Sequence, residues 1–242
     1  MNVKNYFHDR QTLSRVIEIM KTKNNDAEKL TLKKKPNSNR GEETRRMILG
    51  AATKVFSRHT YNAASIRMIA AQGEFQHGLI RYHFPSKAKI FESVIGEACQ
   101  NIRRANKVWI SEISKVSVEK GLALYIERFI EFFHNHPEMF RIVIHIISHD
   151  DPVSLPGYSH LVNLVTNTQK DWEKSFKGIM PKNERRRIFN SLNILIFHYL
   201  GGVAFEAGIL DMDPKSDEYF QWIKETIILV FLPIIKKTMD SY

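Results

Sequence analysis

The chain has 242 residues, and 43% of them are hydrophobic, so it can build a substantial core and is not a wholly disordered protein. Its formal net charge is +10, from 36 Lys and Arg against 26 Asp and Glu. Such a charge favours a polyanionic partner, but net charge alone does not distinguish nucleic acid from an acidic membrane surface.

The excess of positive charge is confined to the first two fifths of the sequence. Residues 1–95 hold 18 Lys and Arg against 8 Asp and Glu, whereas residues 96–242 hold 18 of each kind. A surface that is merely solvated would spread its charge more evenly. The asymmetry therefore predicts one basic contact module followed by a neutral body, with a simple basic tail as the alternative.

Cysteine content and hydropathy indicate where the protein works. The chain has one cysteine, Cys99, so it cannot form an internal disulfide, which suits a reducing compartment. The N-terminus has no apolar stretch of signal-peptide length, and the longest apolar run, residues 227–235, is too short to span a bilayer. We therefore expect a cytoplasmic protein with no membrane partner.

The first 59 residues are predicted to form a polar segment followed by a helix. Residues 1–40 are polar and basic, and Pro36 with the Asn and Ser residues after it predicts irregular chain. Apolar side chains at helical spacing allow one short helix at residues 13–20. From Glu42 the pattern is helical as far as His59. The apolar face of this helix consists of Ile48, Ala51, Ala52, Val55 and Phe56.

Two short helices follow, separated by a tight turn. Ser65 can cap a helix that ends at residue 71, and Gly73 favours a sharp turn after it. A third helix is expected at residues 77–82. Pro85 ends it, and Ser86 can cap a fourth helix that starts at residue 87. The core of this region is expected to contain Ile66, Ile69, Ala70, Leu79, Ile80 and Phe84.

The remainder of the chain is predicted to be helical throughout, so the fold class is all-α. No stretch combines strand alternation with hairpin turn residues. The last two helical segments, residues 183–206 and 216–239, are apolar on several faces and must be covered on more than one side. A partner subunit or a thick monomer core would each provide that cover. Helix breakers stand at residues 136–137, 150–157, 178–181 and 208–214.

Residues 65–82 fit a helix-turn-helix, in which a second short helix with polar early residues follows a tight turn. Around it, residues 44–95 contain an IL-x-AA helix and a phenylalanine, then S-I-x-x-IA, then G-L-x-x-YHF-x-SK. This pattern resembles the TetR family of transcriptional regulators. The resemblance implies an N-terminal DNA-binding domain of three helices, followed by a linking fourth helix, over residues 41–95. It also implies a larger helical ligand-binding and dimerisation domain at 96–242, with residues 1–40 as a partly flexible extension.

The chain departs from the family pattern around the turn. Thr60 stands where a glycine is usual, and Ala64 stands where a threonine often caps the second helix. Residues 73–76 read Gly-Glu-Phe-Gln, where Ala-Gly-Val-Ser is typical. Ser65 must therefore cap the second helix alone.

The resemblance assigns the reading of DNA bases to the start of the third helix. Gln76, His77 and Gly78 fall where side chains reach the major groove. A glutamine can bond adenine through two hydrogen bonds, and the small Gly78 permits close approach. Arg81, in place of a frequent tyrosine, can reach guanine or a phosphate.

The resemblance also implies contacts with the DNA backbone. Tyr82, His83 and Lys87 correspond to phosphate-contacting positions, and a phosphate beside Lys87 would offset the unfavourable placement of a cation at a helix N-terminus. Arg67 can contact the backbone or a base at the edge of the groove. Half-buried packing is the alternative for Tyr82 and His83.

The basic residues ahead of this domain fit two interpretations. Lys33, Lys34, Lys35 and Arg40 form either a solvated tail or a basic arm in the minor groove. Such an arm would strengthen binding through counterion release without reading the sequence.

Other groups of residues give weaker support to the interpretation as an enzyme or a metal-binding protein. His145 and His149 are spaced i, i+4 beside Asp150 and Asp151, which is compatible with a metal site, but the glutamate of a zincin motif is absent. Cys99 has no acid–base cluster around it, and no P-loop or dinucleotide-binding glycine pattern occurs. We expect no catalytic residues, no metal and no cofactor.

These observations predict a homodimeric regulator that binds double-stranded DNA and releases a palindromic operator when a small molecule binds. The alternatives are a helical metal-binding protein or enzyme with an incidental basic domain, and a non-specific DNA binder without a ligand. Six aromatic residues can line an apolar ligand pocket, although plain core is the preferred interpretation for most of them. They are Trp109, Phe129, Phe133, Phe140, Trp172 and Phe176.

Overall fold

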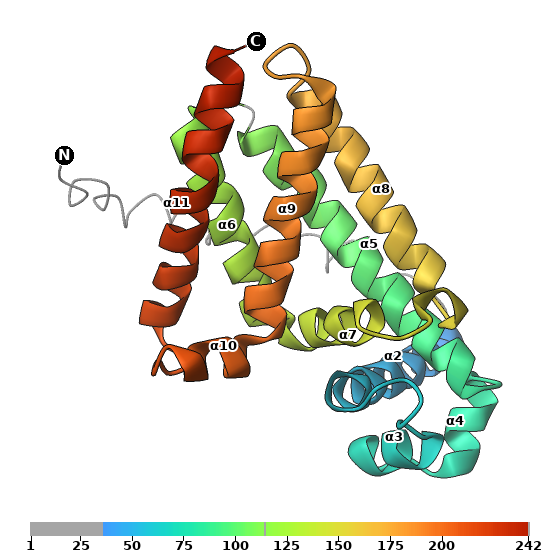
Figure 1. Cartoon of the computed structure of the whole chain (residues 1–242). Coiled ribbons are helices and arrows are strands. Elements are labelled where there is room, and N and C mark those ends of the chain that lie inside the picture. Colours follow the sequence, from blue (N-terminus) through green and yellow to red (C-terminus); the bar gives the residue numbers. More distant parts are fainter. Residues whose placement is uncertain (1–35, 114, 242) are drawn as a thin grey trace. The chain divides into compact units, whose positions relative to one another are not determined.

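The structure is a computed structural model that describes residues 36–113 and 115–241 (Figure 1). Contacts divide the chain into two units, residues 1–46 and residues 47–242. Every element of the described residues is an α-helix, apart from one short 3-10 helix. The prediction of an all-α fold is confirmed.

Helix α2 (Pro36–Arg58) begins earlier than predicted. The expectation of irregular chain at residues 36–40 is wrong, because a proline is compatible with the first turn of a helix, where its missing N–H has no partner in any case. Within residues 1–46, Thr44 donates to the Arg40 carbonyl at 2.9 Å, and Arg46 pairs with Glu43 at 2.8 Å. The short helix predicted at residues 13–20 lies outside the described residues.

The next three helices complete the predicted helix-turn-helix region. They are α3 (Ile66–Gly73), α4 (His77–His83) and α5 (Lys87–Ile113). Their shared core contains Ile69, Ile80 and Phe84, each at most 1% exposed. Leu79 was expected in this core but is 39% exposed, because it lies on the outer side of the short α4. The predicted apolar face of α2 is buried at Ile48, Ala51, Ala52, Val55 and Phe56.

The remaining elements (Figure 1) are α6 (Val118–Asn135), α7 (Pro137–Ile147), η2 (Pro152–Ser154), α8 (Tyr158–Ser175), α9 (Lys182–Gly201), α10 (Val203–Ile209) and α11 (Asp217–Asp240). Helix α5 contacts α6 and α8, while α11 contacts α6 and α9, so the long helices form one continuous core.

The segment predicted as one helix over residues 183–206 is two helices, α9 and α10, which meet at a bend of 85°. A Cβ atom on Gly201 would lie 2.4 Å from Ile144 Cγ1 and 3.1 Å from the Phe140 carbonyl oxygen, so a glycine is needed where α9 meets α7. Among the described residues, no single helix has the length and hydropathy to cross a membrane, and only the bent pair α9–α10 meets these criteria together.

Helix α5 belongs to two hydrophobic cores. Its first half, including Ile90 and Val94, packs with α2, α3 and α4, and this core also contains Ile142 and Ile146 of α7. Its second half, including Trp109, packs with the helices that follow. The DNA-binding region predicted from the sequence therefore rests on α7 as well as on α5.

Candidate functional site

The start of α3 is fixed by the cap that the sequence predicts. Ser65 has an extended backbone, and its hydroxyl oxygen accepts a hydrogen bond from the Met68 N–H at 3.2 Å. This bond satisfies one of the N–H groups that the first turn of a helix leaves without a partner. Ala64 is buried and supplies no side-chain cap, so Ser65 does cap the helix alone.

The turn between α3 and α4 depends on a different residue from the one expected. Glu74, not Gly73, adopts the left-handed conformation, with φ of 56°. The Phe75 N–H donates to the Ala70 carbonyl at 2.9 Å, which closes a Schellman motif. Gly73 is required for another reason: a Cβ atom there would lie 2.1 Å from Cε2 of Phe75. The aromatic ring packs where a side chain would otherwise stand.

Helix α4 presents its polar side chains to solvent. Ile80 is buried, and Phe84, directly after the helix, is also buried, so the helix is anchored along one side. Gln76 is the N-cap residue, yet its side chain makes no capping bond. Tyr82 is 85% exposed, which excludes the half-buried packing alternative for this residue. The exposed positions are Gln76, His77, Gly78, Leu79, Arg81 and Tyr82.

Gly78 occupies α4 without a packing reason. A Cβ atom at this position would meet nothing within 4 Å. A glycine inside a helix destabilises it by about 1 kcal/mol relative to alanine, and nothing in the described residues compensates that cost by close packing. The absence of a side chain leaves the surface of α4 open to close approach from outside.

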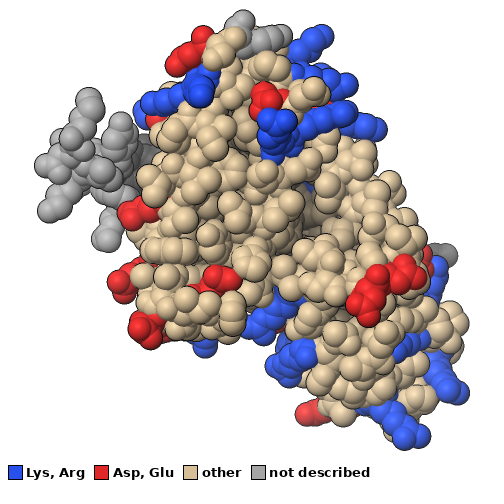
Figure 2. All heavy atoms as spheres, viewed as in Figure 1, with Lys and Arg blue, Asp and Glu red and all other residues tan. Residues whose placement is uncertain are grey.

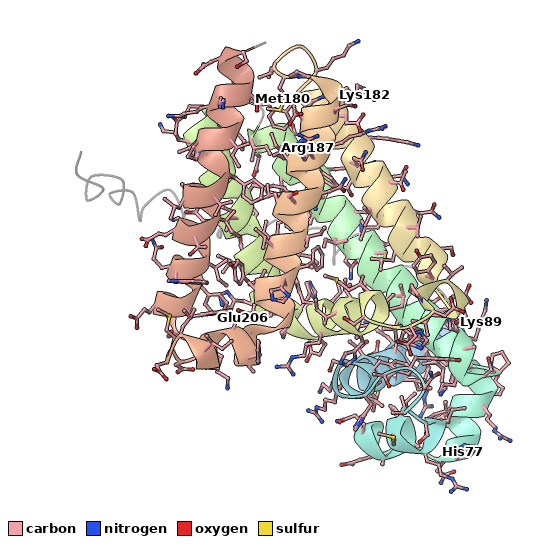
Figure 3. All side chains as sticks on the ribbon, in the orientation of Figure 1. His77, Lys89, Met180, Lys182, Arg187 and Glu206 are labelled. Atoms are coloured by element: carbon pink, nitrogen blue, oxygen red, sulfur yellow. The ribbon has the colours of Figure 1, made fainter. Side chains whose placement is uncertain are left out.

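The side chains expected to contact the DNA backbone differ in their exposure. Arg67 is exposed on α3, and the half-buried His83 ring meets the Tyr82 ring edge-to-face at 5.1 Å. The His77 side chain projects outward at the lower end of the region (Figure 3). Lys and Arg side chains protrude around this part of the surface (Figure 2), which suits a polyanionic partner.

The Lys87 side chain makes hydrogen bonds within the protein, which were not predicted from the sequence. Its Nζ donates to the carbonyl oxygens of Tyr61 at 2.8 Å and Ala64 at 3.0 Å, and lies 4.4 Å from the centroid of the Tyr61 ring. Partial burial lowers the pKa of Lys87. The ammonium thus holds the loop between α2 and α3, the segment in which Thr60 and Ala64 depart from the family pattern. The phosphate contact expected of Lys87 stays a prediction.

The possible basic arm is only partly within the described residues. Lys33, Lys34 and Lys35 lie outside them. Arg40 is exposed but belongs to helix α2, so an extended arm would have to end before Pro36.

The histidine pair considered as a metal site contacts the DNA-binding region instead. His145 Nδ1 lies 3.2 Å from the Phe56 carbonyl oxygen, and His149 Nε2 lies 3.3 Å from Asn62 Nδ2. Among the described residues, no group of three or more His, Cys, Asp or Glu side chains could hold a metal ion. Burial raises the pKa of the Cys99 thiol to about 12, which keeps it protonated and unreactive.

An apolar cavity of about 240 Å³ lies among the C-terminal helices. Of the six aromatic residues considered for a pocket, Trp172 and Phe176 line it. The other four belong to the core, as preferred from the sequence, and lie outside the lining. The wall comes from the end of α5, the start of α6, the end of α8, the start of α9 and the end of α11. Its members include Ile113, Gly121, Tyr125, Met180, Ile188 and Met239.

Helices α9, α10 and α11 carry exposed apolar side chains. Leu229 is 75% exposed and Ile194 is 66% exposed. The described residues on this face leave its middle largely without charged groups (Figure 2). Leu195, by contrast, is partly buried against the core. The remaining exposed apolar residues of these helices are Phe205, Ile209, Val230 and Ile234.

Comparison with known proteins gives a consistent result. Residues 48–94 match the family described as bacterial regulatory proteins, tetR family. The chain is 23% identical over 195 residues to the probable HTH-type transcriptional regulator YttP of Bacillus subtilis (strain 168), a match that covers 76% of this chain and 90% of YttP.

Solved structures share the fold. A protein assigned to the TetR family of transcriptional regulators from Mesorhizobium loti MAFF303099 superposes with a TM-score of 0.57 at 17% identity, covering 81% of this chain and 98% of its own. The fatty acid degradation regulator FadR from Bacillus halodurans gives a TM-score of 0.57 at 15% identity, with 82% and 98% covered. At these identities the likeness extends to the fold alone.

Proposed function

We propose that the chain, whose residues 48–94 match the tetR family of bacterial regulatory proteins, is a ligand-responsive repressor of that family that binds a palindromic operator as a homodimer. The observation that carries this proposal is the surface of α4. A short helix anchored by Ile80 and Phe84 exposes Gln76, Arg81 and a glycine that the protein's own packing does not need. A duplex in close contact would explain why that glycine is present.

Direct readout would come from two side chains of α4. The Gln76 amide makes no capping bond and is available for adenine, and the exposed Arg81 guanidinium suits guanine. Tyr82, His83 and Arg67 would contact phosphates and fix the position of the helix without reading bases. We assign Lys87 to holding the loop before α3, because its ammonium already donates to two carbonyl oxygens.

Two copies would present two α4 helices to one face of DNA. Recognition helices of helix-turn-helix dimers enter successive major grooves about 34–36 Å apart. The exposed apolar face of α9, α10 and α11 supports dimerisation, because a large apolar surface of this kind marks an interaction site. Such a regulator would act on DNA in the cytoplasm.

A ligand in the C-terminal helices would act through α5 and α7. The last turn of α5 lines the cavity, whereas its first turn follows α4, so one helix of 27 residues, about 40 Å long, connects the two regions. Helix α7 adds a second connection through His145 and Phe56. A shift of α5 would change the distance between the two α4 helices and weaken DNA binding, with typical coupling of about 1–3 kcal/mol.

Selection of bound sequences from random double-stranded DNA at physiological salt tests the proposal. We expect enrichment of a two-fold symmetric sequence with half-sites about one helical turn apart. Equal recovery of all sequences would indicate a non-specific binder. The metal-protein alternative would require bound metal in the purified chain, which elemental analysis would detect.

A further inference from the structure

The cavity of about 240 Å³ among the C-terminal helices has a wall without charged side chains. The described residues that line it include no Asp, Glu, Lys, Arg or His. An ion that enters such a cavity loses its water and finds no counterion, which is strongly unfavourable. The wall therefore selects against ligands of either charge.

The three lining residues with a polar side-chain atom offer no free hydrogen-bonding group to a bound molecule. Ser117 caps α6, and its hydroxyl oxygen accepts a hydrogen bond from a backbone N–H at 3.5 Å. The Tyr125 hydroxyl lies 3.3 Å from Asn106 Oδ1 and 3.2 Å from Asn193 Oδ1, so its proton has partners within the protein. The Nε1 atom of Trp172 is not accessible to solvent, so this side chain contributes only apolar surface to the wall.

An uncharged apolar molecule is the occupant that suits this wall. Water in a buried site needs roughly two to four polar partners, which an apolar wall does not provide. Protein interiors keep few voids larger than a water molecule, because the atoms around a void lose contacts. A cavity of about 150 Å³ holds benzene, and scaling from its six carbon atoms gives an occupant of about ten non-hydrogen atoms.

The cavity also has an adaptable wall and access from solvent. Met180 and Met239 line it, and the flexible thioether side chain of methionine adjusts to molecules of different shape. Two other lining residues are exposed, Val116 at 43% and Ile179 at 37%, which places an opening beside them. Met180 lies far from His77 (Figure 3), so a molecule in the cavity would not contact the surface of α4.

We propose that this cavity binds an uncharged apolar molecule of about ten non-hydrogen atoms. The inference rests on the proposed function and deepens it, since it names the class of ligand for the regulator. The bound molecule would contact Ile113, the last residue of α5, and so would act on the helix that leads to α4.

Isothermal titration calorimetry tests this inference, with the full chain titrated into dilute solutions of four probes that share a phenyl ring. The probes are butylbenzene, 3-phenylpropan-1-ol, 3-phenylpropanoate and 3-phenylpropylammonium. One butylbenzene should bind per chain. Both ions should bind at least about tenfold more weakly, because their charge would lose water without gaining a partner. The alcohol should lie between butylbenzene and the ions.

Two variants locate the binding in the cavity. Ile188 is 3% exposed and lines the cavity, so the larger ring of Ile188→Phe should take up its space and weaken butylbenzene binding at least about tenfold. Ile147→Phe is the matched control, since Ile147 is 56% exposed on α7 and is not part of the wall. Met180→Ala should enlarge the cavity and shift the preference from butylbenzene toward hexylbenzene, a gain that an unfolded chain cannot show.

Three results would overturn the inference. They are no binding of butylbenzene, an ion that binds as tightly as butylbenzene, and undiminished binding by a folded Ile188→Phe variant. If Ile188→Phe does not fold, an unchanged preference in Met180→Ala has the same meaning. None of these results concerns DNA, so binding of the selected operator by the same preparations shows separately whether the proposed function stands.

Discussion

Single residues around the helix-turn-helix carry roles that depend on their contacts in space. Glu74 adopts a left-handed backbone conformation that ordinarily favours glycine, while the neighbouring Gly73 leaves room for the Phe75 ring. The sequence shows a glycine near the turn and so predicts the turn itself. It does not show which residue has positive φ, because that depends on where the Phe75 ring packs.

This arrangement predicts opposite effects of two exchanges. Glu74→Gly should raise the free energy of unfolding by up to about 1 kcal/mol, since an L-residue with a side chain is strained at positive φ. Gly73→Ala should lower it, because the new methyl group would require the Phe75 ring to move. Urea unfolding followed by circular dichroism measures both. A stabilising Gly73→Ala would show that the turn has another geometry.

Lys87 gives a second test at this scale. Lys87→Met should lower the free energy of unfolding by about 1 kcal/mol or more, because two carbonyl oxygens lose a charged donor. It should weaken binding to all DNA sequences alike, since the loop before α3 is loosened. Lys89→Met serves as the control, because Lys89 is exposed and pairs with Glu92 on the same helix turn. Unchanged stability of Lys87→Met would show that the two carbonyl contacts do not hold this loop.

At the scale of elements, the sequence predicts the helices near the N-terminus more closely than those near the C-terminus. Ser65, Ser86 and Pro85 mark local boundaries, and caps and prolines act within one turn. The bend between α9 and α10 was missed, and the close approach of Ile144 that leaves no room for a side chain at Gly201 is a contact across more than fifty residues. Most of the residues that line the cavity were not predicted either. The spacing of apolar residues along the sequence is the same whether they line a cavity or fill a core.

The exposed apolar face of α9 to α11 predicts which exchange produces monomers. Leu229→Glu should dissociate the proposed dimer at micromolar concentration, because a charge would be buried in an apolar interface. Val153→Glu is the matched control, since Val153 is 70% exposed on η2 and lies away from these helices. Sedimentation equilibrium measures the mass.

Leu195 and Leu229 differ in exposure, so they are not equivalent positions for this test. Leu195 of α9 is partly buried, so a charge there would disturb the core as well as any interface. Ile194 is the exposed alternative on α9. A monomeric unmodified chain, or a dimeric Leu229→Glu variant, would contradict the assignment of the dimer face.

At the scale of the whole molecule, the uneven charge of the sequence bears on affinity. The basic residues ahead of α2 are expected to add affinity without adding specificity, since phosphate contacts position a protein and base contacts specify its site. Deleting residues 1–35 should weaken binding to operator and random DNA alike and should flatten the slope of log affinity against log salt. Fluorescence anisotropy titrations at several salt concentrations measure this slope, and an unchanged slope would exclude such a role.

The central claim is that α4 reads the operator, and the most direct test repeats the DNA selection with altered α4 side chains. Gln76→Ala and Arg81→Ala should each relax the consensus at one base pair per half-site, because each removes a base contact worth about 1–3 kcal/mol. Tyr82→Phe, which removes only a hydroxyl group, should leave the consensus unchanged. If the two alanine variants select the same consensus as the unmodified chain, α4 does not read the DNA and the account is contradicted.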